Sequence, residues 1–155
     1  MNKPRHGRPT PRMAETPSGM LNSIGLQGPG IDAFLANDVP WLLAQGSRVI
    51  VSIAGETADE YGVLARKIRS TAGISAIEVN ISCPNVENRG LVFATDRDTS
   101  CRVIDSVRKV IGGEIPILAK LTPDVTNIVD VARGVMDSGA DGLALINTVL
   151  GMVIN

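Results

Sequence analysis

One short stretch of the sequence, NISCPN at residues 80–85, places a thiol among amide side chains directly after an alternating apolar run. Cys83 precedes Pro84, and the residue before a proline is biased toward an extended backbone, which holds the thiol in a definite direction. A thiol at the mouth of a polar pocket can serve as a general base, so Cys83 is the candidate. A single cysteine is more often a small buried hydrophobe, and we assign that role to Cys101, which falls on an apolar helical stripe.

A lysine and several asparagines are the other candidate site residues. Lys120 lies inside the apolar run 116–122, where a cation is unfavourable unless it meets an anion or an electron-rich partner. The alternative is a lysine that snorkels from an edge strand. Asparagines that converge suit a planar ligand with amide groups, although asparagine occurs more often in turns and caps. Two of the four candidates fall on expected strands, which argues against a turn role; the four are Asn22, Asn80, Asn85 and Asn147.

Four apolar runs alternate with helical patterns along the chain. Thr57 with Glu60, and Thr95 with Asp98, match the capping-box pattern and are expected to begin two helices. Such alternation predicts an α/β fold with parallel strands and right-handed helical crossovers. The strands are expected at 48–55, 76–82, 116–122 and 141–148. Three apolar stripes with helical spacing lie between successive strands. The first is Tyr61, Leu64, Ala65 and Ile68, the second is Cys101, Ile104, Val107 and Ile111, and the third, which ends near Gly139, is Val125, Ile128, Val129, Ala132, Val135 and Met136.

The first part of the chain is less regular. Residues 1–30 are rich in proline and glycine and are expected to form extended loop, part of which packs through the apolar stretch 20–26. A helix is expected at 31–45, interrupted or kinked near Pro40. The length of 155 residues suits a single domain spanning 1–155.

Composition excludes several classes of function. The formal net charge is -1 with acids and bases interspersed, which gives no case for nucleic acid or an anionic membrane. No apolar run approaches the roughly 20 residues that a membrane span needs. The chain has two cysteines and one histidine without metal-ligand spacing, so no metal site is expected and a reduced, cytoplasmic protein is the default interpretation.

Polar side chains lie near the carboxyl ends of the four expected strands: Ser52, Asn80, Lys120 and Asn147. These ends meet at one edge of a parallel sheet, where sites form in both barrels and open sheets. No GxGxxG motif follows the first strand, which favours a (β/α) barrel. The spacing is 28 residues from Ser52 to Asn80 and 27 from Lys120 to Asn147, but 40 from Asn80 to Lys120. The extra residues fall at 84–95 and predict an active-site lid, with a tolerated surface insertion as the alternative.

Four motifs in order resemble the dihydroorotate dehydrogenase family, most closely its class 1, NAD-linked subclass. The motifs are ETPSGMLNSIGLQGPGID (15–32), NISCPN (80–85), AKLTPDVT (119–126) and GADGLALINTVLGM (139–152). The resemblance covers nearly the whole chain after about residue 7. It implies a (β/α)8 barrel that uses FMN to oxidise dihydroorotate to orotate in pyrimidine (UMP) biosynthesis.

The resemblance also implies a role for each candidate. Cys83 corresponds to the base that removes the C5 proton, while hydride leaves C6 for the flavin. Lys120 corresponds to the lysine beside flavin N1 and O2, where a fixed positive charge stabilises the reduced, anionic flavin. Asn80 and Ser52 lie near the flavin in such an enzyme. The implied substrate-binding residues are Asn22, Ile24, Gly25, Leu26, Asn80, Asn85, Asn147 and Thr148.

The resemblance covers only about half of a barrel, so we expect a fragment with little activity of its own. The NAD-linked subclass implies a separate FAD and iron–sulfur subunit, and we also expect a homo-oligomer. Two alternatives stay open: the pyrimidine-reducing barrel of dihydropyrimidine dehydrogenase, which shares FMN and a catalytic cysteine, and a non-catalytic truncated gene product.

The two cysteines give a matched test, made with the missing barrel units restored. Cys83→Ser should slow flavin reduction by dihydroorotate at neutral pH far more than it weakens substrate binding, because a serine hydroxyl is a poorer base than a thiol with an ordinary pKa of about 8.5. The remaining activity should rise with pH. Cys101→Ser should change stability and leave the pH profile unaltered. Anaerobic flavin reduction measured across pH decides the matter, and an unchanged rate for Cys83→Ser at neutral pH would show that Cys83 is not the base.

Overall fold

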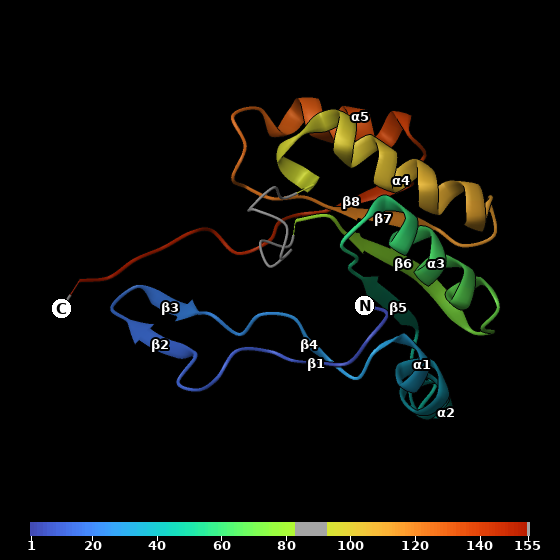
Figure 1. Ribbon diagram of the computed structural model, residues 1–155, viewed down its shortest axis with the longest axis horizontal. Helices are drawn as coiled ribbons and strands as arrows, with labels where there is room; N and C mark the ends of the chain where they lie inside the picture. Colours follow the sequence, from blue (N-terminus) through green and yellow to red (C-terminus); the bar gives the residue numbers. More distant parts are fainter. Residues whose placement is uncertain (83–92, 155) are drawn as a thin grey trace.

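Figure 1 shows the computed structural model as a parallel sheet with its three long helices on one face and two short antiparallel ribbons that form separate sheets. The structure describes residues 1–82 and 93–154. The strand order is β5-β6-β7-β8, and each neighbouring pair is parallel. The strands are β5 (Val49–Ile53), β6 (Ile74–Asn80), β7 (Ile117–Lys120) and β8 (Gly142–Ala144).

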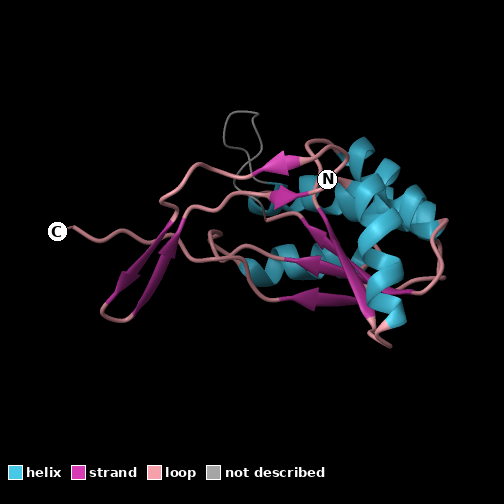
Figure 2. Cartoon of the chain, turned by 90° about the horizontal axis from the view of Figure 1, so that it is seen from below, coloured by secondary structure: helices cyan, strands magenta, loops and turns pink. Residues whose placement is uncertain are grey.

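The three long helices connect successive strands and lie on the same face of the sheet (Figures 1 and 2). They are α3 (Ala58–Arg69), α4 (Arg97–Ile111) and α5 (Ile128–Asp137). An open doubly wound sheet carries helices on both faces, whereas a barrel carries them all outside. The described part of the chain is therefore about half of a (β/α)8 barrel, and the predicted α/β architecture is confirmed.

Alternation along the strands separates the apolar core from a second, polar face. Ile77 and Val79 of β6 point toward the helices and have no exposed surface. Glu78, between them, points to the opposite, concave face and is only partly buried. On β5, Ile50 and Ser52 likewise leave the core and are exposed. The concave face is therefore where polar side chains can gather.

The predicted caps are half right. Thr57 is the N-cap of α3, and its hydroxyl accepts a hydrogen bond from the Glu60 N–H at 3.2 Å. The cap predicted at Thr95 is wrong: Asp96 is the N-cap of α4, and its carboxylate accepts from the Thr99 N–H at 2.7 Å. Thr95 instead closes a 3₁₀ turn, η2 (Phe93–Thr95). Aspartate and threonine are both common N-cap residues, so the sequence pattern allowed the cap to be assigned to Thr95, one residue before the actual cap, Asp96.

The helical stripes also need correction. The α3 stripe is buried as predicted, and so are Ile104, Val107 and Ile111 of α4. Cys101 is only half-buried, at the contact with α5, where its Sγ lies 2.9 Å from the position that a Cβ on Gly134 would take. In α5 the stripe is displaced: Val131 and Val135 are buried, whereas Val129 and Met136 are 52% and 40% exposed. Only the side of α5 that packs on the sheet and on α4 is covered.

Residues 1–30 are more ordered than predicted. Two antiparallel ribbons replace the expected loop: β1 (Arg5–His6) pairs with β4 (Gln27–Gly28), and β2 (Met13–Thr16) pairs with β3 (Gly19–Asn22). The predicted interruption near Pro40 is confirmed, because a π-helical segment lies just before this proline, which has no N–H to donate. The helical segments are α1 (Ile31–Ala33), η1 (Phe34–Asp38) and α2 (Val39–Ala44). Among the described residues, none of the helices has the length and apolarity required to span a membrane.

Asp141 fastens the amino-terminal end of the sheet. Its carboxylate accepts hydrogen bonds from the Ile117 N–H at 2.7 Å and from Arg108 Nη2 at 2.5 Å, and its own N–H donates to the Ile117 carbonyl at 2.8 Å. Burial raises the pKa of Asp141, but the hydrogen bonds from Ile117 and Arg108 outweigh burial and lower the pKa below its ordinary value. The carboxylate thus joins the starts of β7 and β8 to the end of α4.

We expect Asp141→Ala to lower the free energy of unfolding of the chain by about 1–3 kcal/mol, because the Ile117 N–H loses its acceptor. Asp105→Ala is the matched control. Asp105 has the same side-chain exposure, 49%, but pairs at 2.6 Å with Lys109 on the surface of α4. Its loss should cost at most about 0.5 kcal/mol. Urea denaturation at pH 7 measures both values, and equal costs would contradict the role given to Asp141.

This contribution depends on pH in a defined direction. Because the pKa of Asp141 is lower in the folded chain than in the unfolded chain, its stabilisation is fully present above about pH 3.9 and is lost as the pH falls through the lowered pKa. The difference between the parent and Asp141→Ala should therefore shrink only in strong acid.

Candidate functional site

Three side chains from neighbouring strands meet on the concave face of the sheet: Ser52, Glu78 and Lys120. Ser52 and Glu78 are register partners, and the Ser52 hydroxyl donates to Glu78 Oε1 at 2.7 Å. Lys120 Nζ lies 3.7 Å from the same oxygen. We call these residues the Ser52–Glu78–Lys120 row. Lys120 belongs to an inner strand, between β6 and β8, so the alternative of a lysine on an edge strand is wrong for the described sheet.

Glu78 is the member of the row that was not among the predicted site residues. Its signal was present, since a carboxylate stands between Ile77 and Val79 in an otherwise apolar strand and shares a face with Asn80. A charge at such a position is unfavourable without a partner. Lys120 and Ser52 are the partners, and they come from strands on either side.

Asn80 ends β6 beside Lys120, its register partner on β7. Tyr61 of α3 donates from its hydroxyl to the Asn80 carbonyl at 2.7 Å, which ties the strand end to the core. The Asn80 side-chain oxygen accepts from the Ser82 N–H at 3.2 Å and from the Ser82 hydroxyl at 2.8 Å. Asn80 is 9% exposed. Asn80 and Lys120 therefore lie next to each other at the carboxyl end of the sheet.

Asn147 joins the same edge from a different kind of position than predicted. β8 ends at Ala144, so the strand predicted to run to residue 148 is too long and Asn147 lies in the segment beyond it. Its Nδ2 nevertheless donates to the Ser82 carbonyl at 2.5 Å, and its N–H donates to the Leu121 carbonyl at 3.0 Å. Asn147 Oδ1 accepts from the Thr148 N–H at 2.9 Å. Asn147 therefore links the ends of β6 and β7, and Thr148 follows it on the exposed surface.

The predicted substrate-binding residues near the amino terminus lie at the end of the β2–β3 ribbon. Asn22 ends β3 and is exposed, and the half-buried run Ile24–Leu26 follows. The Ile24 carbonyl accepts from the Arg8 N–H at 2.9 Å, and Gly25 adopts a positive φ of 74°, which favours glycine. Within the described residues, no hydrogen bond joins Asn22 to Asn80 or Lys120.

The β2–β3 ribbon and the carboxyl-terminal segment lie side by side in both views (Figures 1 and 2). Leu21 Cδ2 lies 3.1 Å from the position that a Cβ on Gly151 would occupy. The neighbourhood of Asn22 is thus brought toward the segment that follows Asn147 and Thr148. These two groups of predicted residues are more than 120 positions apart in sequence.

Cys83 and Asn85 lie outside the described residues, and so does most of the predicted lid at 84–95. The described end of that stretch is the 3₁₀ turn η2, which packs on the core. The rings of Phe93 and Tyr61 meet edge-to-face with centroids 6.0 Å apart. The Ala94 N–H donates to the Ile81 carbonyl at 3.0 Å. The connection after β6 therefore returns to the sheet next to the strand end that carries Asn80.

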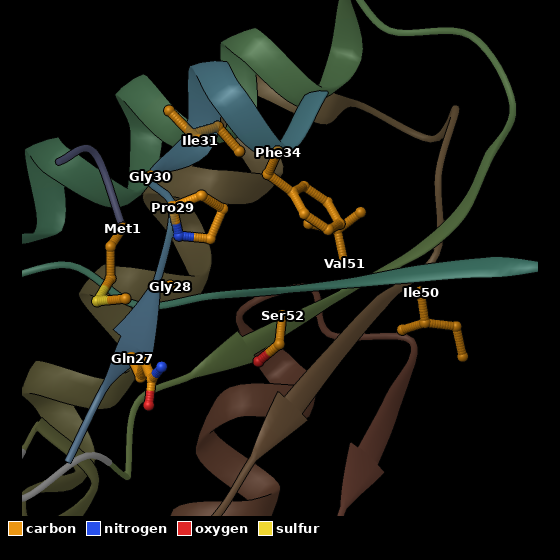
Figure 3. A pocket seen from close by; sticks show the side chains of 10 residues that line it. All are labelled: Met1, Gln27, Gly28, Pro29, Gly30, Ile31, Phe34, Ile50, Val51 and Ser52. Atoms are coloured by element: carbon orange, nitrogen blue, oxygen red, sulfur yellow. The ribbon is translucent and has the colours of Figure 1, made fainter. Parts of the chain in front are cut away.

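A cavity of about 350 Å³ opens beside β5, where Figure 3 shows its lining. Ile50, Val51 and Ser52 form its strand side, and the opposite wall is the connection from β4 to α1. Most of the lining is apolar, including Met1 and Phe34. Ser52 belongs to both the cavity and the Ser52–Glu78–Lys120 row, so a ligand of the concave face would have apolar contacts at this side.

A parallel sheet whose three connecting helices all lie on one face (Figure 1) is typical of the β/α-barrel class of proteins, in which sites lie at the carboxyl ends of the strands. Comparison with known proteins is more specific: the family model for dihydroorotate dehydrogenase matches residues 1–155. The chain belongs to the dihydroorotate dehydrogenase family.

Individual relatives agree. The chain is 50% identical to the catalytic subunit of dihydroorotate dehydrogenase B (NAD(+)) of Desulforamulus reducens, over 99% of this chain and 50% of that protein. It is 48% identical to the subunit of the same name in Geotalea uraniireducens, with the same coverage. The crystal structure of the Eimeria tenella dihydroorotate dehydrogenase in complex with ferulenol matches with a TM-score of 0.68 at 18% identity, over 97% of this chain and 49% of that one. The chain spans about half the length of these relatives.

The bonds of Asn147 generate a prediction for the chain itself. Asn147→Ala should speed hydrogen exchange of the Asn147 and Thr148 amides by about fivefold, the equivalent of one lost hydrogen bond of about 1 kcal/mol. Asn147→Asp keeps an acceptor for the Thr148 N–H but turns an oxygen toward the Ser82 carbonyl, so it should affect mainly the Asn147 amide. Asn127→Ala, which removes the N-cap of α5, serves as the control and should act within α5 alone. Unchanged exchange in both Asn147 variants would contradict this link.

Proposed function

We propose that this chain is the central part of an FMN-dependent dihydroorotate dehydrogenase, which oxidises dihydroorotate to orotate in pyrimidine biosynthesis. The observation that carries the proposal is the Lys120 ammonium on the concave face, next to Asn80, in a member of this family. Its one ion pair in the described residues, with Glu78 Oε1 at 3.7 Å, is too long for a hydrogen bond, so the ammonium keeps its donors for a ligand on this face.

The donor set suits one edge of a flavin ring system. Flavin presents carbonyl and ring-nitrogen acceptors on its pyrimidine side, and this side becomes negative on reduction. Lys120 supplies a cation there, and Asn80 supplies an amide from the adjacent strand. Ser52 borders the largely apolar cavity beside β5. Bound FMN would supply a hydride acceptor, and Lys120 would stabilise the charge that hydride transfer produces.

The asparagines and Cys83 would handle the substrate. Dihydroorotate carries a carboxylate and ring amides, which pair with the donors and acceptors of asparagine side chains. Asn147 and Thr148 lie at the carboxyl edge, and Asn22 with Ile24–Leu26 lies on the ribbon beside the following segment. Cys83, three positions after the last residue of β6 in the sequence, would take the C5 proton, and Asn85 would join the same pocket.

Several partners follow from the same proposal. The relatives are named as catalytic subunits of an NAD(+) enzyme. We propose that the complete protein passes electrons to a separate subunit carrying FAD and an iron–sulfur cluster, which reduces NAD, and that it forms a homo-oligomer in the cytoplasm. No group of three or more histidine, cysteine or acidic side chains in the described residues could hold a metal ion.

The test uses a complete barrel, made by joining this chain to the part of the Desulforamulus reducens subunit that it does not match. The purified protein should bind FMN, and dihydroorotate should reduce that FMN anaerobically while dihydrouracil should not. Lys120→Met should slow the reduction by about 100-fold, because the cation at the developing negative charge is lost. Lys109→Met is the control, since Lys109 lies 73% exposed on α4.

Two results would contradict the proposal. Reduction by dihydrouracil in place of dihydroorotate would favour the dihydropyrimidine dehydrogenase type of barrel. A folded complete barrel that binds no flavin would exclude the redox function altogether.

A further inference from the structure

Glu78 is the centre of the Ser52–Glu78–Lys120 row, and the proposed reaction gives it no role. Its Oε1 accepts the Ser52 hydroxyl at 2.7 Å and faces the Lys120 ammonium at 3.7 Å. The Glu78 side chain is 21% exposed and that of Lys120 is 27% exposed, so both charges are largely withdrawn from water. The Glu78 carboxylate is therefore held in a fixed position on the concave face by a side chain of the neighbouring strand.

The distances show what kind of contact this is. The Ser52 bond fixes the carboxylate oxygen, whereas 3.7 Å is too long for an N–H···O hydrogen bond. The contact with Lys120 is therefore an ion pair without a directed bond. Within the described residues, Glu78 is the sole ion-pair partner of Lys120 and Nζ makes no hydrogen bond, so the ammonium keeps its three N–H donors for a ligand.

The position of Glu78 along β6 places its charge deeper in the sheet than the charge of Lys120. Glu78 lies two residues before Asn80 and therefore one layer deeper on the same face, while Lys120 is level with Asn80. A negative charge beneath the ammonium attracts it toward the sheet and weakens the positive field that it presents at the carboxyl edge. The field at a ligand depends on both charges, and not on Lys120 alone.

From this geometry we infer that Glu78 is a positioning residue for Lys120 and a fixed counter-charge that lowers the reduction potential of the flavin bound at the carboxyl edge. The inference rests on the proposed function, because it concerns the flavin that Lys120 would contact. A less positive field stabilises the anionic reduced flavin less, so electrons leave it more readily for the next carrier. Ser52 acts one step further away, by holding Glu78.

The experiment compares neutral and charged variants in the FMN-loaded complete barrel. Glu78→Gln removes the charge but keeps an oxygen that can accept the Ser52 hydroxyl. Its flavin midpoint potential should move to a more positive value. Sulfite, which adds to flavin as an anion, should bind about threefold to tenfold more tightly, as expected for one missing negative charge nearby. Glu78→Met is a second neutral variant, and either one is sufficient if the other does not fold.

Two controls separate charge from structure. Glu78→Asp keeps the charge and should stay close to the parent in both measurements. Asp105→Asn makes the same change in net charge on the outer surface of α4 and should have no effect. A purely structural role for Glu78 would disturb Glu78→Asp as much as Glu78→Gln.

The outcomes distinguish this inference from the proposed function. A parent protein that binds FMN and is reduced by dihydroorotate, with unchanged potential and sulfite affinity in the neutral Glu78 variants, would overturn the inference and leave the function standing. A folded parent without flavin would overturn both. A positive shift confined to the neutral Glu78 variants supports the inference.

Discussion

The alternation of side chains along β6 is the constraint on which the rest of the site depends. Ile77 and Val79 have no exposed surface, and their burial against the helices fixes which way the strand faces. Glu78 and Asn80 must then lie on the concave face, because a shift of one residue would exchange core and site. The hydrogen bond from Tyr61 to the Asn80 carbonyl holds the strand end in that register. Packing on one side of the sheet thus positions the chemistry on the other.

The polar groups of the concave face are paired with one another more than the sequence suggests. Asn80 uses its side-chain oxygen on Ser82, and Asn147 uses its Nδ2 on the Ser82 carbonyl. Each bond satisfies a group that would otherwise be costly to remove from water. The same bonds fix the orientation of both asparagine side chains. Lys120 differs, since its contact with Glu78 is an ion pair at 3.7 Å and leaves its donors for another partner.

The positive charge of Lys120 on this face is partly balanced by the negative charge of Glu78. In a half-buried place the field of an ammonium reaches far, because water screens it little. The Glu78 carboxylate, one layer deeper than Lys120, offsets part of that field. Such an arrangement allows the strength of an electrostatic site to be set by a residue that touches no ligand.

The sequence by itself determined the strand and helix order, the parallel sheet and the carboxyl-edge position of Asn80 and Lys120, because these follow from local periodicity and strand direction. The family motifs were also readable, since they are contiguous. Tertiary structure alone decided the rest. The choice of Asp96, and not Thr95, as the N-cap of α4 depended on the path of η2, which ends at Thr95. The exposure of Val129 depended on which neighbours α5 has. The pairing of Glu78 with Lys120 needed two strands, about forty residues apart in sequence, to lie side by side, and no local pattern records such a contact.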